Sequence, residues 1–128
     1  MPNSSVITVS RILLSIIFIV AGAGKLMGGP ANFAGYLGQL GFPAPLFFAW
    51  ATTLLELVGG LMLLVGFQVR AVAIALAAFC VASAFVAHFD FADQTQMSSF
   101  MKNIALAGGY LLLTVTGAGP LSIDGRKA

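Results

Sequence analysis

Four apolar segments of about twenty residues each dominate this chain of 128 residues, over about 6–27, 44–66, 69–89 and 98–117. A helix of roughly 20 apolar residues is long enough to cross the hydrocarbon core of a bilayer. Charged residues make up only 8% of the chain, where a soluble domain carries roughly a quarter. The chain therefore has too few polar groups to cover a surface in water. The sequence predicts an all-α membrane protein, a single domain over 1–128 that folds as a four-transmembrane-helix bundle.

The segments that connect these helices differ in character. Segment 28–43 is bounded by Gly and Pro and places four apolar side chains at helical spacing: Phe33, Tyr36, Leu37 and Leu40. This pattern predicts a short amphipathic helix that lies in the membrane interface between the first two spans. The second connector is only 67–68, which predicts a tight antiparallel hairpin. The third, 90–97, is polar and is expected in water.

The basic residues predict the orientation in the membrane, because loops on the cytoplasmic side are enriched in Lys and Arg. With both termini in the cytoplasm, four of the six basic residues lie inside and two lie outside. The inner set is Arg11, Arg70, Arg126 and Lys127, and the outer set is Lys25 and Lys102. An alternative interpretation of the N-terminus is a cleaved signal peptide, with Arg11, a short apolar run and the sequence Ala-Gly-Ala at 21–23. Cleavage there would leave three spans.

Several function classes are disfavoured by composition. The dispersed basic residues form no stripe for nucleic acid. The single cysteine, Cys80, excludes an intrachain disulfide and Cys-x-x-Cys chemistry, and we expect it at a helix contact. With one histidine and no cysteine cluster, no metal or haem site is expected.

Glu56 stands in the otherwise apolar or small stretch TTLLELVGGLMLL, residues 52–64, near the middle of its predicted span. A charged carboxylate at mid-bilayer costs a few kcal/mol, about 2.5–3.5 on insertion scales, so it is expected to be paired, hydrated or protonated. Helical periodicity puts a stripe of small and polar residues on each span, and such stripes are expected to face one another. The stripe of the first span is Arg11, Ser15, Phe18, Gly22 and Lys25, and that of the second is Thr52 or Thr53, Glu56, Gly59, Gly60 and Leu63. The stripe of the third span is Ala77, Cys80, Ala84 and His88, and that of the fourth is Ser99, Lys102, Asn103, Leu106 and Gly109.

From these stripes we predict a polar cavity that opens outward, with Glu56 at its floor and Lys102, Asn103 and His88 along its wall and mouth. Lys102 from above and Arg11 from below are the expected partners of Glu56, and a neutral acid hydrogen-bonded to Thr52 or Thr53 is the structural alternative. The catalytic candidates are Glu56, Lys102 and His88, and the cofactor-binding candidates are Asn103, Lys25 and Trp50. His88 and Lys25 also fit interfacial anchors.

The tail after Pro120 is expected to end the fourth helix. Ser122 and Asp124 have side chains that bind backbone amides in turns. We expect them to pack against the inner helix ends, with Arg70 or Arg11 as the salt partner of Asp124.

The whole chain resembles the DoxX family of small bacterial membrane proteins. The residues that carry the resemblance are RILLSIIFIVAGAGKL at 11–26, LELVGGLMLLVGFQVRAVA at 55–73, His88, and 100–124 with its Lys-Asn-x-Ala-Leu-x-Gly-Gly pattern and Gly-x-Gly-x-x-Ser-x-Asp exit. The resemblance implies a four-helix protein of the bacterial inner membrane. It also implies kinship to the small membrane subunit of thiosulfate:quinone oxidoreductase, and some members are reported to group with superoxide dismutase and a sulfurtransferase. The family supplies no agreed catalytic residues.

Two functions follow as hypotheses. The first is a subunit or accessory of a quinone-linked redox, sulfur or oxidative-stress system, in which a partner subunit supplies electrons and a headgroup slot is lined by Phe85, Phe89, Phe100 and Trp50. These aromatic residues also fit an interfacial aromatic belt. The second is a non-catalytic anchor or assembly scaffold for soluble redox enzymes. A small-solute transporter is disfavoured because the chain lacks the repeat halves and broken helices of transporters. Besides lipid and soluble partners, a second copy of the chain is a conceivable partner.

Overall fold

The computed structural model describes residues 2–127, which contain helices and no strand. The helices are α1 (Pro2–Gly28), α2 (Pro30–Gln39), α3 (Pro45–Val65), α4 (Val69–Ala87), α5 (Gln94–Thr116) and α6 (Ile123–Lys127). Residues 1 and 128, the two ends of the single domain expected, lie outside the described range. The all-helical prediction is confirmed, as is the short helix within 28–43.

Three helices among residues 2–127 are long and apolar enough to cross a membrane: α1 over Ser4–Gly28, α3 and α4. Helix α5 has 23 residues and is long enough, but it is not among these candidates. Its N-terminal half is polar, with Gln94, Thr95, Gln96, Ser98, Ser99, Lys102 and Asn103.

The boundaries of the third connector differ from the prediction. Helix α4 ends at Ala87 rather than 89, and α5 begins at Gln94 rather than 98. The early start has a local cause, because the Asp93 side chain accepts a hydrogen bond from the Thr95 backbone N–H at 2.9 Å and caps the helix. The polar connector predicted over 90–97 is therefore only the short turn between Ala87 and Gln94.

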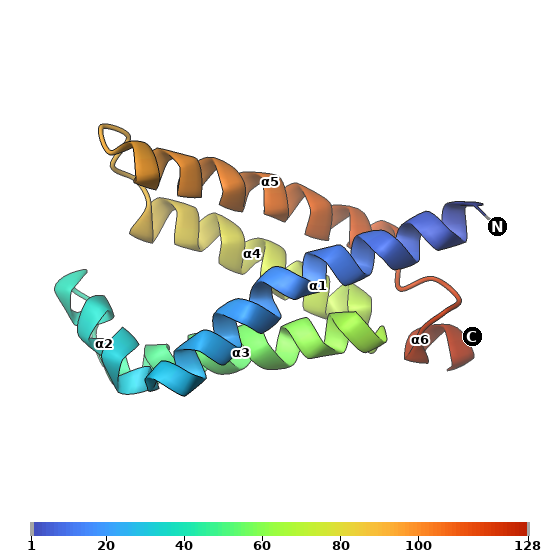
Figure 1. Ribbon diagram of the computed structural model, residues 1–128, viewed down its shortest axis with the longest axis horizontal. Helices are drawn as coiled ribbons and strands as arrows, with labels where there is room; N and C mark the ends of the chain where they lie inside the picture. Colours follow the sequence, from blue (N-terminus) through green and yellow to red (C-terminus); the bar gives the residue numbers. More distant parts are fainter. Residues whose placement is uncertain (1, 128) are drawn as a thin grey trace.

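The long helices pack as two pairs, α1 with α3 and α4 with α5. Figure 1 shows the two pairs meeting near the termini and diverging toward the end that carries α2. The contacts between the pairs lie in the half nearer the termini, where the Tyr110 hydroxyl donates to the Leu14 carbonyl oxygen at 2.6 Å. There too, a Cβ on Gly59 would lie 3.5 Å from Leu76 of α4. The two pairs thus form a V that is closed at one end.

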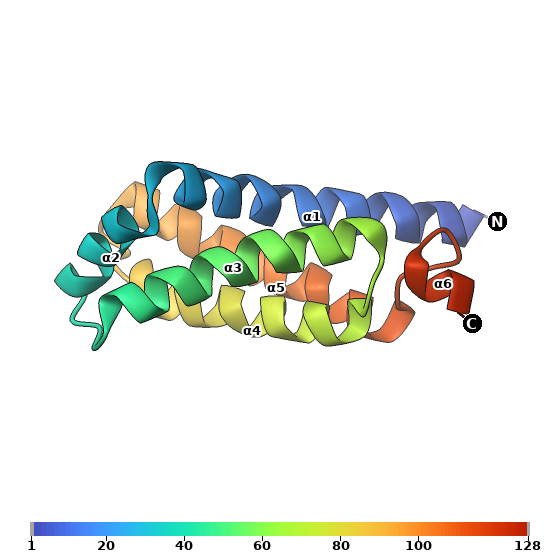
Figure 2. The ribbon, with the colours of Figure 1, turned by 90° about the horizontal axis from the view of Figure 1, so that it is seen from below.

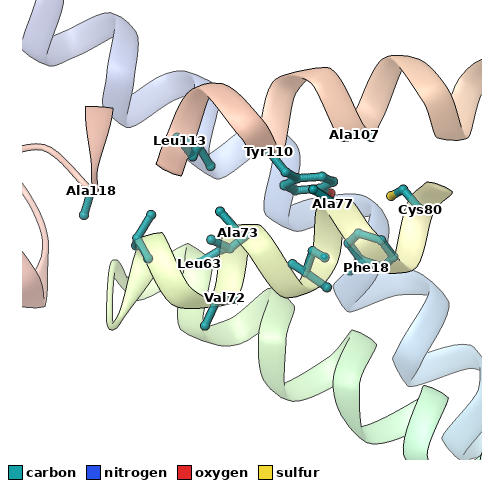
Figure 3. Close-up of a cluster of buried hydrophobic side chains, with 12 residues drawn as sticks. Phe18, Leu63, Val72, Ala73, Ala77, Cys80, Ala107, Tyr110, Leu113 and Ala118 are labelled. Carbon is teal, nitrogen blue, oxygen red and sulfur yellow. The ribbon is translucent and has the colours of Figure 1, made fainter. Parts of the chain in front are cut away.

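An apolar core fills the closed end of the V, and Figure 3 shows its side chains between α4, α5 and the other two long helices. Tyr110, Leu63 and Leu76 are fully buried there, and Phe18 packs against Tyr110 with ring centroids 5.5 Å apart. Cys80 is buried in the same core, as predicted.

The small and polar stripes are confirmed on α1, α3 and α4, where most of their members are buried. On α5 the predicted stripe is confirmed in part: a Cβ on Gly109 would lie 3.0 Å from Leu14 of α1, but the most buried residues lie one position further along the helix. Its buried residues are Ala107, Tyr110 and Leu113, whereas Lys102 is exposed and Gly109 only half-buried. The reason is the divergence of the two pairs, because the first half of α5 has no helix of the other pair against it and only its second half enters the core.

Arg11 joins three parts of the chain at the closed end, and this corrects its predicted role. Its side chain is 2% exposed, and its guanidinium donates to the carbonyl oxygens of Leu63 (2.6 Å), Leu64 (2.5 Å), Ala118 (3.1 Å) and Leu121 (2.8 Å). Two of these carbonyls, those of Leu63 and Leu64, belong to the last turn of α3, where helix carbonyls lack regular partners within the helix. The Leu63 oxygen also accepts from the Gly66 backbone N–H at 3.1 Å, so Arg11 adds a second donor there. Arg11 therefore serves backbone groups and is no partner of Glu56.

Asp124 also has a different partner from the one predicted. Its two carboxylate oxygens accept hydrogen bonds from the backbone N–H groups of Gln68 (2.8 Å) and Val69 (2.9 Å), and its own N–H donates to the Gly66 carbonyl oxygen. It therefore caps the N-terminus of α4 across 55 residues of sequence, instead of forming the ion pair expected with Arg70 or Arg11. The prediction that the tail packs against the helix ends is confirmed.

Candidate functional site

A cleft of about 660 Å³ occupies the open half of the V, between the two helix pairs and under α2. Because all five longer helices contribute to it, no single segment of sequence contains the site. Its walls are Ile17, Phe18, Ala21 and Lys25 of α1; Phe33, Tyr36, Leu37, Leu40 and Phe42 of α2 and its C-terminal turn; Phe48, Ala51, Thr52, Leu55 and Glu56 of α3; Phe79, Ala82, Ser83, Val86, Ala87 and His88 of α4 and its C-cap; and Lys102, Asn103 and Leu106 of α5.

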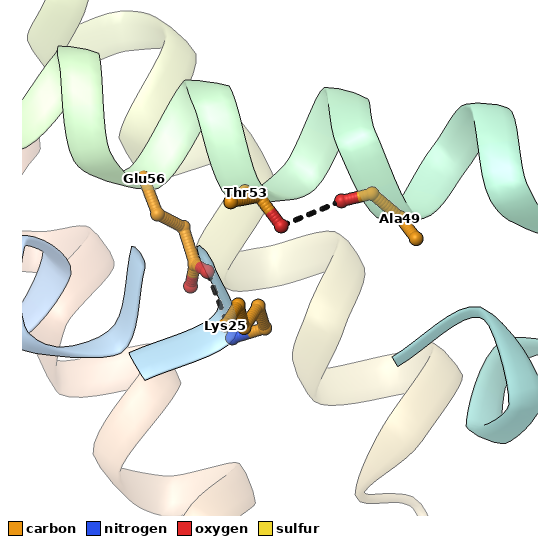
Figure 4. A network of polar contacts seen from close by, with 4 residues as sticks. All are labelled: Lys25, Ala49, Thr53 and Glu56. Atoms are coloured by element: carbon orange, nitrogen blue, oxygen red, sulfur yellow. Dashed lines mark hydrogen bonds and ion pairs between the residues drawn. The ribbon is translucent and has the colours of Figure 1, made fainter. Parts of the chain in front are cut away.

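The floor of the cleft carries a buried ion pair. The Lys25 Nζ atom lies 2.8 Å from Oε1 of Glu56, and Figure 4 shows the two side chains meeting between α1 and α3. The Glu56 side chain is 6% exposed and that of Lys25 is 23% exposed. Within the described residues, no hydrogen-bond donor of good geometry reaches Oε1, so the ion pair is the polar contact that compensates this oxygen.

The partner of Glu56 was predicted incorrectly. Lys102 lines the same cleft from α5 but forms no ion pair with Glu56, and Arg11 is engaged at the other end of the molecule. Nor does Thr53 serve the acid, because its hydroxyl donates to the Ala49 carbonyl oxygen at 2.8 Å (Figure 4). Lys25 lies on the same helix pair as Glu56, so the ion pair is a contact within that pair.

Two glycines explain why Lys25 reaches Glu56. A Cβ on Gly22 would lie 2.5 Å from the Leu57 backbone nitrogen, and one on Gly60 would lie 3.0 Å from the Ile19 nitrogen. The backbones of α1 and α3 therefore touch at both positions, as small residues in membrane helices allow. Lys25 is one turn beyond Gly22, and its cation also suits the C-terminal end of α1.

Helix α2 covers the cleft and contributes a second partner for Lys25. Ala34 and Leu37 pack against Ala49 of α3, with Phe33 and Phe42 beside them. The Lys25 Nζ atom lies 4.9 Å from the centroid of the Phe33 ring, a cation–π distance. Sequence reasoning placed Phe33 on the apolar face of a helix but missed this contact, since only the aromatic spacing within 28–43 signals it.

The facing wall is formed by α4 and α5 and holds His88, Lys102 and Asn103. His88 follows the last residue of α4 and lies outside the candidate span Val69–Ala87. Burial lowers the pKa of its imidazole below the ordinary value, and the positive charge of Lys102 acts in the same direction. Both effects favour the neutral imidazole, which can accept and donate a hydrogen bond.

The aromatic residues proposed for a headgroup slot lie elsewhere. Phe85, Phe89 and Phe100 form a cluster with Phe91 at the ends of α4 and α5, with centroids 5.0–6.1 Å apart, and these residues are not among those lining the cleft. Trp50 is 43% exposed and is also absent from the lining. The aromatic walls of the cleft come instead from α2 and from Phe18, Phe48 and Phe79.

The chemistry available in the cleft follows from these groups. Apolar and aromatic side chains form most of the lining, and a few polar groups converge on it, which is typical of a small-molecule site. Lys25, Lys102 and Asn103 can donate hydrogen bonds, and Glu56 and neutral His88 can exchange protons. No three His, Cys, Asp or Glu side chains among residues 2–127 gather closely enough to hold a metal ion.

Comparison with known proteins identifies the family. The DoxX family model matches residues 6–89, about two thirds of the chain. The chain belongs to the DoxX family. Among its relatives is the inner membrane protein YqjF of Escherichia coli K12, 42% identical over 120 residues that cover 92% of this chain and 88% of YqjF. Another is the inner membrane protein YphA of the same organism, 32% identical over 124 residues, 92% of this chain and 87% of YphA. No solved structure matches the chain.

The match places this DoxX protein in the inner membrane. Its relatives are inner membrane proteins, and three of its helices suit a membrane span. The matched residues 6–89 include Lys25, Phe33, Glu56 and His88, while Lys102 and Asn103 of the opposite wall follow the matched segment. The resemblance inferred from the sequence is confirmed.

Proposed function

We propose that this DoxX protein is a membrane-embedded binding subunit of a quinone-linked redox, sulfur or oxidative-stress system. The observation that carries the proposal is the cleft: about 660 Å³ of mostly apolar space with one buried Lys–Glu pair on one wall and donors on the other. A quinone headgroup is an apolar ring that bears carbonyl acceptors. Lys25 donates to one carbonyl from α1, and Lys102 or Asn103 donates to the other from α5.

Reduction of a quinone to a quinol takes two electrons and two protons. In this proposal the chain holds no electron carrier of its own, so a soluble redox partner supplies the electrons. Glu56, behind Lys25, and His88, at the end of α4, exchange protons with the reduced oxygens, because both are within the lining of the cleft. Glu56, Lys102 and His88 are then the catalytic groups, with Lys25 and Asn103 binding the headgroup.

In the same proposal α5 completes a bundle of four spans and α2 lies in the outer interface. Support comes from the ribbon, in which α5 runs alongside α4 and the chain ends lie together at the closed end of the V (Figure 2). An even number of spans returns the chain to the side on which it began, and the basic residues favour the cytoplasm for that side. A reporter fused after Ala128 is expected to be active in its cytoplasmic form, and a cysteine replacing Asp93 is expected to react from outside. The reverse labelling would contradict this orientation.

The lone tryptophan gives a direct binding assay, since Trp50 lies on α3 near the cleft residues Phe48, Ala51 and Thr52. A short-chain benzoquinone added to purified protein in nanodiscs is expected to quench Trp50 fluorescence saturably. Asn103→Leu, which removes a donor from the cleft, is expected to raise the Kd about tenfold. Thr114→Val, on an α5 position outside the lining, is the matched control.

Linear quenching without saturation, or equal Kd values for the Asn103 and Thr114 variants, would count against a quinone site. Recovery of soluble redox enzymes with a protein that binds no quinone would instead support the anchor hypothesis.

A further inference from the structure

Lys25 is held by two helices at once. Its ammonium lies 2.8 Å from the Glu56 carboxylate of α3 and 4.9 Å from the centroid of the Phe33 ring of α2. A lysine side chain has four rotatable bonds and no fixed direction of its own, so an ion pair alone leaves it several conformations. The ring is a second contact for the ammonium, and two contacts restrict a lysine side chain more than one does.

The exposed fractions of the two charged side chains show which of them a ligand in the cleft contacts first. Lys25 keeps 23% of its side chain exposed while Glu56 keeps 6%, and both line the cleft. A ligand in the cleft therefore contacts the ammonium first and the carboxylate through it. The direction in which the ammonium points decides whether it can donate to that ligand.

The position of Phe33 depends on how α2 is seated. Gly29 at φ +89° precedes α2 and Gly41 at φ +88° follows its C-terminal turn, so the helix is connected through two left-handed glycines. Between them Ala34 and Leu37 hold α2 on α3, and Phe33 stacks on Tyr36 at 5.8 Å. The position of the ring is therefore set by the packing of α2 on α3.

We propose that Phe33 is a positioning residue of the cleft: its ring fixes the Lys25 ammonium between Glu56 and the ligand space, and so couples the seating of α2 to the donor on the cleft floor. The identity of the ligand rests on the proposed function above, whereas the effect of Phe33 on Lys25 can be measured without any ligand.

The experiment is acylation of lysines in the folded, membrane-embedded protein, followed by mass spectrometry. Lys102 lines the same cleft without the Phe33 contact and is the reference within each molecule. Phe33→Leu is expected to raise the Lys25:Lys102 ratio of acylation rates about fivefold, the Boltzmann factor of a cation–π contact of about 1 kcal/mol. Phe33→Tyr keeps an aromatic face and is expected to restore the wild-type ratio.

Phe42→Leu is the matched control, because Phe42 lines the same cleft and packs in the same small cluster but makes no ring contact with Lys25. An unchanged ratio in Phe33→Leu, or the same increase in Phe42→Leu, would overturn the proposal, since the latter means general loosening of α2. A higher ratio in Phe33→Leu alone supports it. Quinone binding by the same variants is measured in a separate titration. If no quinone binds but the Lys25:Lys102 ratio rises in Phe33→Leu alone, only the proposed function is refuted.

Discussion

Gly22→Ala tests whether contact between the α1 and α3 backbones positions the buried ion pair. The added Cβ would lie 2.5 Å from the backbone nitrogen of Leu57 and 2.8 Å from its Cα, where ordinary contacts begin at 3.4 Å. Backbone atoms cannot rotate away as a flexible side chain can. The helices must therefore separate locally by about 0.9 Å, the difference between 3.4 and 2.5 Å.

Two destabilising contributions oppose one stabilising contribution. Inserting a methyl group into a close-packed contact costs about 1–3 kcal/mol, and sometimes more. A gap of 0.5–1 Å opened between neighbouring atoms also forfeits roughly a quarter to a half of their dispersion attraction. Against this, Ala favours a helix over Gly by about 1 kcal/mol. Subtracting this gain from the insertion cost leaves a free energy of unfolding lower by about 0–2 kcal/mol, and the lost dispersion attraction moves the value toward the upper end.

Gly24→Ala is the matched control, two residues further along α1, because a Cβ there meets nothing within 4 Å. It makes the same chemical change and gains the same helix propensity, so its stability is expected to be unchanged or up to about 1 kcal/mol higher. Unfolding of both variants in mixed micelles by titration with a denaturing detergent, followed by circular dichroism, measures the difference.

The ion pair provides a second readout, because Lys25 is one turn beyond Gly22 and Glu56 precedes Leu57. Separation of the two helices is expected to raise the acylation rate of Lys25 in Gly22→Ala but leave it unchanged in Gly24→Ala. Equal stabilities of the two variants would refute the reasoning, since they would mean that the backbones do not touch at Gly22.

Four further perturbations follow from the contacts described. Arg11→Lys is expected to lower the free energy of unfolding by about 2–5 kcal/mol, because one ammonium cannot serve four buried and part-buried carbonyls. The same denaturant titration measures this, and wild-type stability would contradict the role of Arg11. Asp124→Ala removes the cap of α4 and is expected to cost about 1 kcal/mol, while Asp124→Asn keeps an acceptor and should lose less. Glu56→Gln leaves the ammonium of Lys25 without its counter-charge and is expected to lower the free energy of unfolding by about 1–2 kcal/mol, a modest loss because Lys25 is partly exposed. Adding Lys25→Met is expected to recover most of the lost stability. No recovery would mean that the two groups are not coupled. Because the pKa of His88 is lowered in the folded protein, the unfolded state binds more protons below about pH 6.5. The free energy of unfolding is therefore expected to fall as the pH drops through that value, and to fall less in His88→Gln. Equal pH slopes of the two proteins would show that the imidazole is not desolvated.

Much of the architecture could be predicted from the sequence, because membrane spans and helix faces depend on local composition and periodicity. The lengths of the apolar runs located α1, α3 and α4 to within a few residues, apart from the early start of α1. Spacing of three and four residues grouped the buried faces of these helices, and the aromatic pattern in 28–43 marked α2. The isolation of Glu56 in an apolar run identified the one acid that needs a partner within the bundle.

The choice of partner for Glu56 could not be read from that pattern. Lys25, Lys102 and Arg11 all lie on predicted inward faces at depths a long side chain can span, so periodicity alone does not separate them. The tertiary structure selects Lys25 because Gly22 and Gly60 bring α1 onto α3, whereas α5 diverges from them at the depth of Lys102.

Tertiary structure alone also decided the contacts that join distant segments. Arg11 and the Ala118 carbonyl are 107 residues apart, and no local rule predicts that a guanidinium will serve a backbone oxygen at that separation. The same holds for the cap that Asp124 provides to α4. Composition and helical period determined which segments are long and apolar enough to span a membrane and which faces of α1, α3 and α4 turn inward, because a lipid solvent and a fixed 3.6-residue turn act on each segment by itself. Which polar groups meet inside depended on where helix backbones can touch, and that is a property of two segments together.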